Sequence, residues 1–201
     1  MSNPDLAIYT MHSAFWGAFA VTRIIVGRRD RNKESAEGAA SIPAKEITAP
    51  FSRMLVAFHA LAFAVMYIGI GIAVFPRRVP VWFAGQSIVG SMVIAGGAIL
   101  VVSALLSFRS WRFRASVDAH HQLATGGPFR FLRHPIYMGL NLLAFGTAIW
   151  VPTGIVWIAL ALMVIGGDLR ARAEETLLMN AFGDSYREYC ARTRRFVPGI
   201  Y

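Results

Sequence analysis

Residues 121–139 of this chain are HQLATGGPFRFLRHPIYMG, and this segment determines the fold expected around it. Its Gly-Gly-Pro sequence predicts a loop, because glycine permits positive φ and proline fixes the direction in which the chain leaves. Arg133, His134 and Tyr137 then stand at the start of an apolar run. Pro135 suits the first position of a helix, whose free N–H groups attract carboxylates. Taken alone, these residues also suit an interfacial anchor with an aromatic-belt tyrosine.

The composition is that of a membrane protein. Hydrophobic residues make up 56% of the 201 residues and charged residues only 15%, which is too apolar for an ordinary soluble domain. The formal net charge of +9 would suit a nucleic-acid-binding protein, but the basic residues lie between apolar runs rather than on one soluble face. The one cysteine, Cys190, excludes an intrachain disulfide.

Five apolar segments predict an all-α, polytopic membrane protein with about five transmembrane helices. They cover residues 6–27, 54–75, 81–108, 136–151 and 154–165. The first segment lacks a basic flank on its N-terminal side, which predicts an uncleaved anchor. The last two are short and are separated by Pro152 and Gly154, which predicts a C-terminal helical hairpin. A cytosolic C-terminal helix is expected to follow over 168–189.

Charge bias predicts the orientation. Basic residues concentrate in the polar linker 28–53, in the loop before Pro135 and in the tail 168–195. With five crossings these three segments fall on one side, and only Arg77 and Arg78 lie opposite. By the positive-inside rule that side is the cytoplasm, which leaves the N-terminus outside. The short, plain chain suggests a bacterial inner-membrane protein whose motif loop and tail share the cytoplasmic face.

The tail supplies a second set of polar side chains. Arg170 and Glu174 are four residues apart, so a helix presents both on one face, and Arg172 and Glu175 flank them. An exposed pair of this kind contributes only about 0.3 kcal/mol and is common on helix surfaces. Here the pair follows an apolar segment directly and is expected beside the motif loop. That convergence favours a functional site.

The sequence predicts no metal site. His120 and His121 are adjacent, but no second pair of ligands stands at a suitable spacing, and Cys190 has no recognisable partner. No Walker loop and no dinucleotide-binding glycine motif is present. The pattern is therefore not that of a nucleotide-binding α/β enzyme.

The two segments together resemble the isoprenylcysteine carboxyl methyltransferase family and the related small membrane methyltransferases, which include phospholipid methyltransferases. The first matching pattern is L-x-T-x-GPFRF-x-RHP-x-Y-x-G over residues 123–139. The second consists of EE-x-x-L at 174–178, FG-x-x-Y-x-x-Y at 182–189 and RFVP at 195–198. In this order and spacing the pattern is specific to the group rather than to one substrate.

The resemblance implies an S-adenosyl-L-methionine-dependent methyltransferase with N-terminal transmembrane helices over 1–108 and a catalytic region over 109–201. It implies catalytic roles for Arg170, Glu174 and Arg133, and substrate binding by Arg170 and Arg172. The residues implied to bind the cofactor are His121, Gln122, Leu123, Ala124, Phe129, His134, Pro135, Ile136, Tyr137 and Glu174. The acceptor is expected to be lipophilic and most simply a carboxylate, as in isoprenylcysteine carboxyl O-methylation, since a carboxylate is ionised at neutral pH and needs no base. A thiol or amine acceptor would need one, with His134 as the candidate.

Two other functions stay open at this point. One is an NADPH-dependent membrane reductase of the sterol-reductase type, and the other is a non-catalytic membrane scaffold in which the polar residues are interfacial anchors. Binding of adenosylmethionine analogues or of NADPH separates the two enzymes. The expected partners are a lipophilic small molecule or lipid-modified substrate and membrane lipids, with no nucleic acid and no metal.

Overall fold

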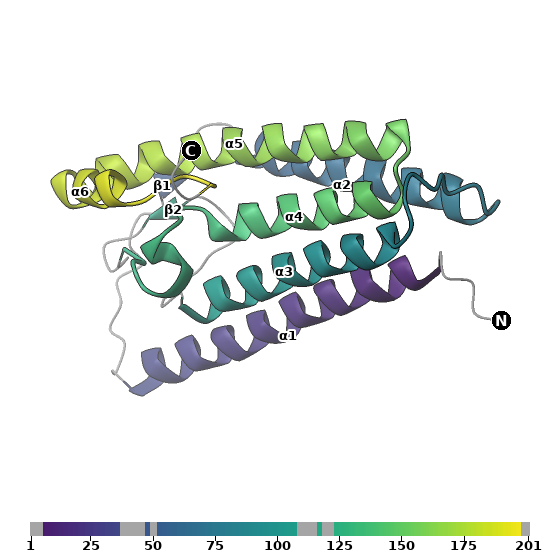
Figure 1. The fold of residues 1–201 in the computed structure, drawn as a ribbon. Coiled ribbons are helices and arrows are strands. Elements are labelled where there is room, and N and C mark those ends of the chain that lie inside the picture. Colours follow the sequence, from purple (N-terminus) through teal and green to yellow (C-terminus); the bar gives the residue numbers. More distant parts are fainter. Residues whose placement is uncertain (1–5, 37–46, 49–51, 108–115, 118–122, 198–201) are drawn as a thin grey trace.

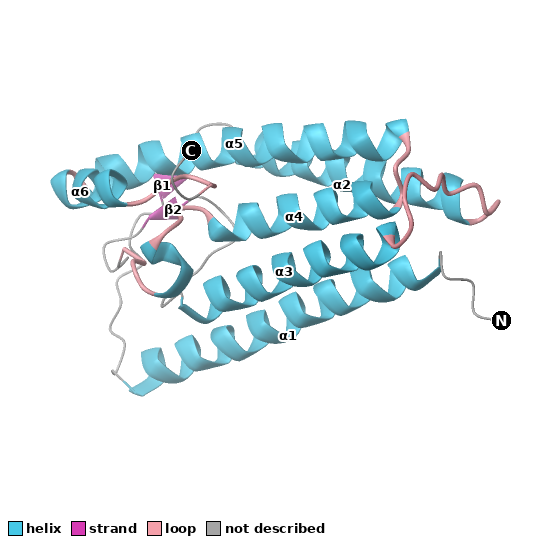
Figure 2. Cartoon of the chain, in the orientation of Figure 1, coloured by secondary structure: helices cyan, strands magenta, loops and turns pink. Residues whose placement is uncertain are grey.

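The computed structural model describes residues 6–36, 47–48, 52–107, 116–117 and 123–197. Within these ranges the α-helices are α1 Ala7–Ala36, α2 Ser52–Val74, α3 Gln86–Ser107, α4 Pro135–Trp150, α5 Gly154–Phe182 and α6 Asp184–Arg192. A short 3-10 helix, η2, spans Gly127–Arg130. Two-residue strands, β1 Ile47–Thr48 and β2 Ser116–Val117, pair antiparallel. Five long helices lie side by side, with α6 and the strands at one end (Figures 1 and 2).

The bundle is held by apolar contacts and by two close helix approaches. Helix α3 packs on α1 and α4, and α5 packs on α2 and α4. A Cβ on Gly90 would lie 2.7 Å from the Gly146 carbonyl oxygen, and a Cβ on Gly97 would lie 2.7 Å from that of Gly139. The backbones of α3 and α4 therefore touch at two levels, as small residues allow in membrane proteins. A third glycine of α3, Gly96, faces away from these contacts, since a Cβ there would meet nothing within 4 Å.

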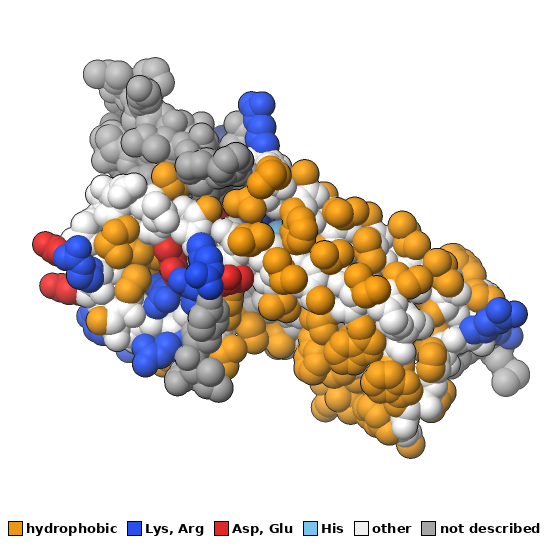
Figure 3. Space-filling view, turned by 90° about the horizontal axis from the view of Figure 1, so that it is seen from above, with side chains coloured by type: hydrophobic (Ala, Val, Ile, Leu, Met, Phe, Trp, Pro, Cys, Tyr) orange, Lys and Arg blue, Asp and Glu red, His pale blue; other side chains and the backbone are white. Residues whose placement is uncertain are grey.

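Apolar side chains cover the outside of the helices, as a lipid environment requires. Among the described residues, three helices are long and apolar enough to cross a membrane: Arg53–Val74, Gln86–Ser107 and Gly154–Phe182. Helix α4 is apolar but shorter. Figure 3 shows hydrophobic side chains over most of one face, with the acidic side chains and many of the basic ones toward the end that carries α6, and further basic side chains at the opposite end. The protein is an integral membrane protein of predominantly α-helical fold, and its expected five crossings stay a prediction.

The first helix is longer than the sequence predicted. Helix α1 continues past Gly27 to Ala36, so the expected linker 28–53 begins as helix. Its residues 28–36 contain neither proline nor glycine, and Arg, Lys, Glu and Ala are good helix formers. Apart from β1 and the start of α2, most of the remaining linker lies outside the described residues. Helix α1 is not one of the three long apolar helices.

The charged helix expected over 168–189 is not a separate element, and that boundary was wrong. Helix α5 passes through Gly166-Gly167 without a break and ends at Phe182. The glycines are packing positions, since a Cβ on Gly166 would lie 2.9 Å from Cδ1 of Phe58. The break comes at Gly183, whose φ of +53° suits glycine and separates α5 from α6. At 29 residues, α5 is about 43 Å long. It therefore extends beyond a bilayer core about 30 Å thick.

Candidate active site

The motif loop delivers its polar side chains to the start of α4. Gly127 has φ +56° and packs against Ser107 at the end of α3, where a Cβ would collide. The η2 turn follows, and Pro135 occupies the first turn of α4 with His134 as the N-cap residue. His134 is 6% exposed. The loop therefore turns inward and directs its histidine toward α5.

Tyr137 lies between two charged residues of α5. Its hydroxyl donates a hydrogen bond to Oε1 of Glu174. The guanidinium carbon of Arg170 lies 5.0 Å from the centroid of the Tyr137 ring, which is a cation–π distance. The predicted one-turn spacing thus presents Arg170 and Glu174 to the same aromatic side chain. Glu174 keeps 23% of its side chain exposed, so this carboxylate is accessible from one side.

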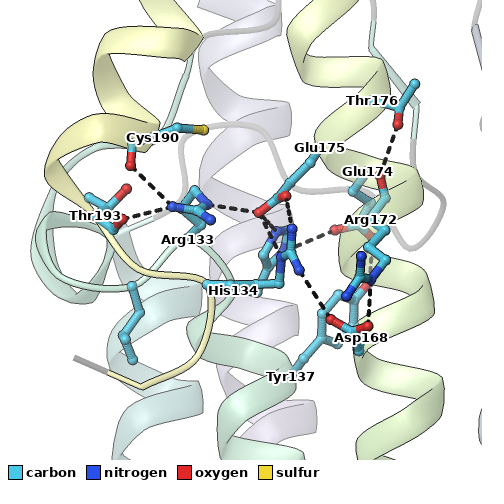
Figure 4. A network of polar contacts seen from close by, with 12 residues as sticks. Arg133, His134, Tyr137, Asp168, Arg172, Glu174, Glu175, Thr176, Cys190 and Thr193 are labelled. Atoms are coloured by element: carbon cyan, nitrogen blue, oxygen red, sulfur yellow. Dashed lines mark hydrogen bonds and ion pairs between the residues drawn. The ribbon is translucent and has the colours of Figure 1, made fainter. Parts of the chain in front are cut away.

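Glu175 is the centre of an ionic cluster (Figure 4). Arg133 donates from Nε to its Oε1 at 2.7 Å. Arg195 donates to both carboxylate oxygens, from Nη2 to Oε2 at 2.6 Å and from Nε to Oε1 at 3.1 Å. Nε2 of His134 lies 3.3 Å from Oε1. The side chains of Arg133, Glu175 and Arg195 are each at most 15% exposed, so solvent screens these contacts less than on an open surface.

The ionic cluster fastens the C-terminal tail to the motif loop. The backbone N–H of Arg133 donates to the Arg194 carbonyl at 2.7 Å, within a short parallel bridge. Arg133 also donates from Nη1 to the Thr193 carbonyl at 2.7 Å and to the Cys190 carbonyl at 3.3 Å. The Tyr189 hydroxyl of α6 donates to the carbonyl of Phe129 at 2.8 Å. The two halves of the motif pattern therefore form one layer over the end of the bundle.

His134 sits between two carboxylates. Its Nδ1 lies 3.5 Å from Oε2 of Glu174, and its Nε2 faces Glu175. Burial disfavours the charged imidazolium, but hydrogen bonds to Glu174 and Glu175, together with their negative charges, outweigh it and raise the pKa of His134. The ring also stacks on Tyr137, with centroids 5.8 Å apart. A cationic, aromatic and carboxylate surface thus lines the end of the apolar bundle.

Comparison with known proteins identifies the group. The profile of the phospholipid methyltransferase family matches residues 86–185. A probable protein-S-isoprenylcysteine O-methyltransferase of Oryza sativa subsp. indica is 32% identical over 130 residues, which are 63% of this chain and 67% of that protein. The chain belongs to the isoprenylcysteine carboxyl methyltransferase family. It is therefore a membrane methyltransferase, and the relatives' names place it among carboxyl O-methylating enzymes rather than reductases or scaffolds.

Two further comparisons agree. Protein-S-isoprenylcysteine O-methyltransferase B of Arabidopsis thaliana is 30% identical over 113 residues, or 55% of this methyltransferase and 57% of that protein. The solved structure of the eukaryotic intramembrane Ras methyltransferase ICMT (isoprenylcysteine carboxyl methyltransferase) superposes with a TM-score of 0.65. It covers 100% of this chain and 69% of that one, at 19% identity. This structural similarity shows that the two proteins share a fold.

In this methyltransferase the structure brings some predicted site residues into direct contact and leaves others apart. His134, Tyr137, Arg170 and Glu174 form one continuous group. Pro135 and Ile136 belong to the first turn of α4, and Phe129 is buried in η2. The half-buried Leu123 and Ala124 precede that turn. His121 and Gln122 lie outside the described residues.

Two predicted arginines make other contacts. Arg133 is directed toward the tail, as described above. Arg172 donates from Nε to Oδ2 of Asp168 at 2.6 Å, and its side chain is 58% exposed. Asp168 also lies 3.3 Å from Nη1 of Arg195. Within the described part of the chain, no three His, Cys, Asp or Glu residues gather in a way that could hold a metal ion.

Sequence reasoning assigned no role to Glu175, Arg195 or Asn141. Glu175 and Arg195 stood inside the matching patterns, but nothing in one sequence reveals that a tail residue returns to a helix 20 residues earlier. Asn141 carried a usable signal: it is a polar residue in an apolar run, one helical turn after Tyr137. That spacing puts both side chains on one face of α4.

Proposed function

We propose that this methyltransferase transfers a methyl group from S-adenosyl-L-methionine to the carboxylate of a lipophilic acceptor of the prenylcysteine type. One observation carries the proposal. Tyr137 joins the partly exposed carboxylate of Glu174 to the guanidinium of Arg170 at the end of an apolar helix bundle. The relatives named above are isoprenylcysteine O-methyltransferases, and that acceptor combines a carboxylate with a hydrocarbon chain.

The donor suits the residues at the rim. S-adenosyl-L-methionine supplies an activated methyl group on a positively charged sulfur. Glu174 would hold its ammonium group, because the carboxylate is partly open to solvent. The ring of Tyr137 offers an aromatic face to the sulfonium cation. Phe129 and the half-buried Leu123 and Ala124 would border its apolar part.

The acceptor suits the side of Tyr137 that carries Arg170. A carboxylate is ionised at neutral pH, so the chain needs no general base and must only orient the oxygen toward the methyl group. Arg170 would bind that carboxylate through its planar guanidinium. Arg133 would act as a positioning residue, because it holds the tail that closes over His134. Arg172, largely exposed, would steer acidic acceptors rather than bind them.

The proposed arrangement in the membrane follows from charge. The α1 end that carries Arg28, Arg29 and Arg31 lies at the same end of the bundle as α6 (Figure 1). Arg77 and Arg78 follow α2, whose C-terminal end lies away from the site (Figure 1). The positive-inside rule then orients the site toward the cytoplasm, with five crossings and the N-terminus outside. We retain 1–108 as the N-terminal transmembrane helices and 109–201 as the catalytic region, which includes the α4–α5 hairpin. The relatives named above are eukaryotic and lend no support to a bacterial origin.

Calorimetric titration with S-adenosylhomocysteine tests the donor. We expect saturable binding by the detergent-purified protein and a loss of about 30-fold or more in Glu174→Gln, which keeps the shape of the side chain but removes its charge. Glu188→Gln on the exposed side of α6 is the matched control and should bind as the wild type does. NADPH should give no heat. If the folded protein does not bind S-adenosylhomocysteine, the assignment of the methyl donor is wrong.

The chemistry of the product tests the acceptor. With a tritiated methyl donor and an S-prenylated N-acetylcysteine, a carboxyl methyl ester releases volatile methanol in base, whereas N-methyl and S-methyl products do not. We expect base-labile label, and we expect Arg170→Lys to lower kcat/KM at least 100-fold because an ammonium cannot bind a carboxylate bidentately. Base-stable label would instead identify an amine or thiol acceptor.

A further inference from the structure

The polar surface of the site continues inward beyond Tyr137. Asn141 follows Tyr137 by one turn of α4, and both face Gly167 of α5. A Cβ on Gly167 would lie 3.6 Å from Oδ1 of Asn141 and 3.8 Å from Cβ of Tyr137. Asn141 is only 9% exposed, and its Oδ1 has no hydrogen-bond partner among the described residues. A buried amide oxygen without a partner carries an uncompensated desolvation cost.

A second side chain with unpaired hydrogen-bonding atoms approaches Tyr137 from another helix. His59 projects from α2, is 5% exposed, and has its ring centroid 5.9 Å from that of Tyr137. A Cβ on Gly166 would lie 3.0 Å from its Nδ1, so the two adjacent glycines of α5 admit His59 and Asn141 together. Neither ring nitrogen meets hydrogen-bond geometry with a described residue, although the Leu55 carbonyl interacts weakly with the ring.

These observations define one site with Arg170. Arg170 follows Gly166 by four residues and lies over the ring of Tyr137, which His59 also contacts. Three chemical capacities therefore converge: a guanidinium, an imidazole nitrogen and an amide oxygen that accepts a hydrogen bond. A carboxylate matches the guanidinium and an imidazole N–H. The amide oxygen needs an N–H, which a carboxylate alone lacks.

The geometry points to Asn141 and His59 as specificity-determining residues that select an acceptor carboxylate bearing an adjacent amide N–H. Asn141 Oδ1 accepts from that N–H, and a ring N–H of His59 donates to the carboxylate beside Arg170. The ligand would be an N-acylated, lipid-bearing amino acid, such as the C-terminal residue of a lipidated peptide. This inference rests on the proposed function, because it assigns atoms of the same acceptor.

Paired acceptors test the inference. The first is an N-acetylated S-prenylcysteine, and the second is the matching S-prenyl-3-mercaptopropionate, which keeps the carboxylate and the hydrocarbon chain but lacks the amide. We expect wild-type kcat/KM to favour the first about tenfold, the factor that one satisfied hydrogen bond supplies. Asn141→Leu should abolish the preference by raising KM for the first acceptor alone, with an unchanged Kd for S-adenosylhomocysteine.

Stability separates ligand binding from a structural role. Because Oδ1 of Asn141 has no partner in the described residues, Asn141→Leu should not lower the unfolding temperature. Thr153→Val is the matched control, because its hydroxyl is also buried and has no hydrogen-bond partner in the described part of the chain. Thr153 lies at the far end of the same hairpin, so both KM values should stay unchanged. His59→Phe should raise KM for both acceptors and keep their ratio.

The contrary outcomes are distinct. An unchanged acceptor preference in Asn141→Leu, or a lowered unfolding temperature with equal losses on both acceptors, would overturn the role of Asn141. Unchanged KM values in His59→Phe would overturn that of His59. If the wild type methylates neither acceptor, the proposed function itself fails.

Discussion

Two polar networks lie within this bundle, and they are built on different principles. At the α6 end, Glu175 binds Arg133 and Arg195 and faces His134, so the network is ionic. Near the other end, the network around His12 consists of neutral hydrogen-bonding groups. Helix α4 contributes to both, through the residue before its first turn and through Thr147 near its last. These positions are about 20 Å apart along the helix.

The His12 network is fully paired and fixes one tautomer. Thr147 donates its hydroxyl to the Leu143 carbonyl at 2.7 Å, so its Oγ1 can only accept from Nε2 of His12, at 2.9 Å. Nδ1 then accepts from the Tyr67 hydroxyl at 3.1 Å, and Trp16 donates to that oxygen at 2.7 Å. The imidazole is neutral. The His12 network therefore joins α1, α2 and α4 through uncharged groups, whereas the charged groups of the Glu175 cluster lie at the end of the bundle that carries α6.

The largest expected effect comes from neutralising the ionic network. Glu175→Gln leaves the guanidinium groups of Arg133 and Arg195 and the imidazole ring of His134 without their shared carboxylate. We expect a loss of about 3 kcal/mol in unfolding free energy and faster proteolysis of the tail after α6. Arg187→Gln, in the exposed pair with Asp184, is the control and should change neither. A Glu175→Gln protein as stable as the control would show that the ionic network does not hold the tail.

The neutral network should affect stability alone. His12→Leu removes two hydrogen bonds and leaves the Tyr67 hydroxyl proton unpaired, which we expect to cost about 2 kcal/mol. The Kd for S-adenosylhomocysteine should stay within about twofold of the wild type, because the site lies at the other end of α4. Unfolding temperature and titration on the same preparation measure both quantities. A large loss of binding would mean that the two networks are coupled.

Stability should also vary with pH through the ionic network, to a smaller extent. The pKa of His134 is raised in the folded state, so the folded protein holds this proton more tightly than the unfolded chain. The stabilisation is complete below the unfolded pKa of about 6.5 and is lost as the pH rises through the higher folded value. Unfolding temperatures measured from pH 6 upward should fall, and the fall should flatten in Glu175→Gln. An equal slope in both proteins would assign the pH dependence to other groups.

The sequence predicted the helices that follow from apolar periodicity and the turn that proline and glycine mark. The apolar runs became helices, and Pro152 with Gly154 marks the turn between α4 and α5. The segment expected to end at residue 165 continues as α5, because glycine has two uses: it can end a helix, or, as at Gly166 and Gly167, it can make room for a neighbour. Only the position of His59 on another helix distinguishes them, and one sequence does not give that position.

For the candidate site, the sequence could predict which side chains share a helix face, but not which segments meet in the fold. The spacing of Arg170 and Glu174 is local, and the structure places both on Tyr137 as helical geometry requires. The ion pair between Glu175 and Arg195 depends on how the chain after α6 folds back onto α5. A pairing of this kind has no periodic signature. The motif resemblance located the region, and the fold was needed to assign its contacts.

The close approach of α3 and α4 has a mechanical consequence. Their backbones touch at Gly90 with Gly146 and at Gly97 with Gly139, so neither helix can slide or separate without losing both contacts. Tyr137 and Asn141 therefore lie on α4, which is held rigidly against α3. For the proposed lipophilic acceptor we expect entry by displacement of α5 or α2, which carry Arg170 and His59 on the other side of Tyr137. We expect backbone amides of α3 and α4 to exchange hydrogen most slowly, and the entry movement to have a fixed direction, away from α3.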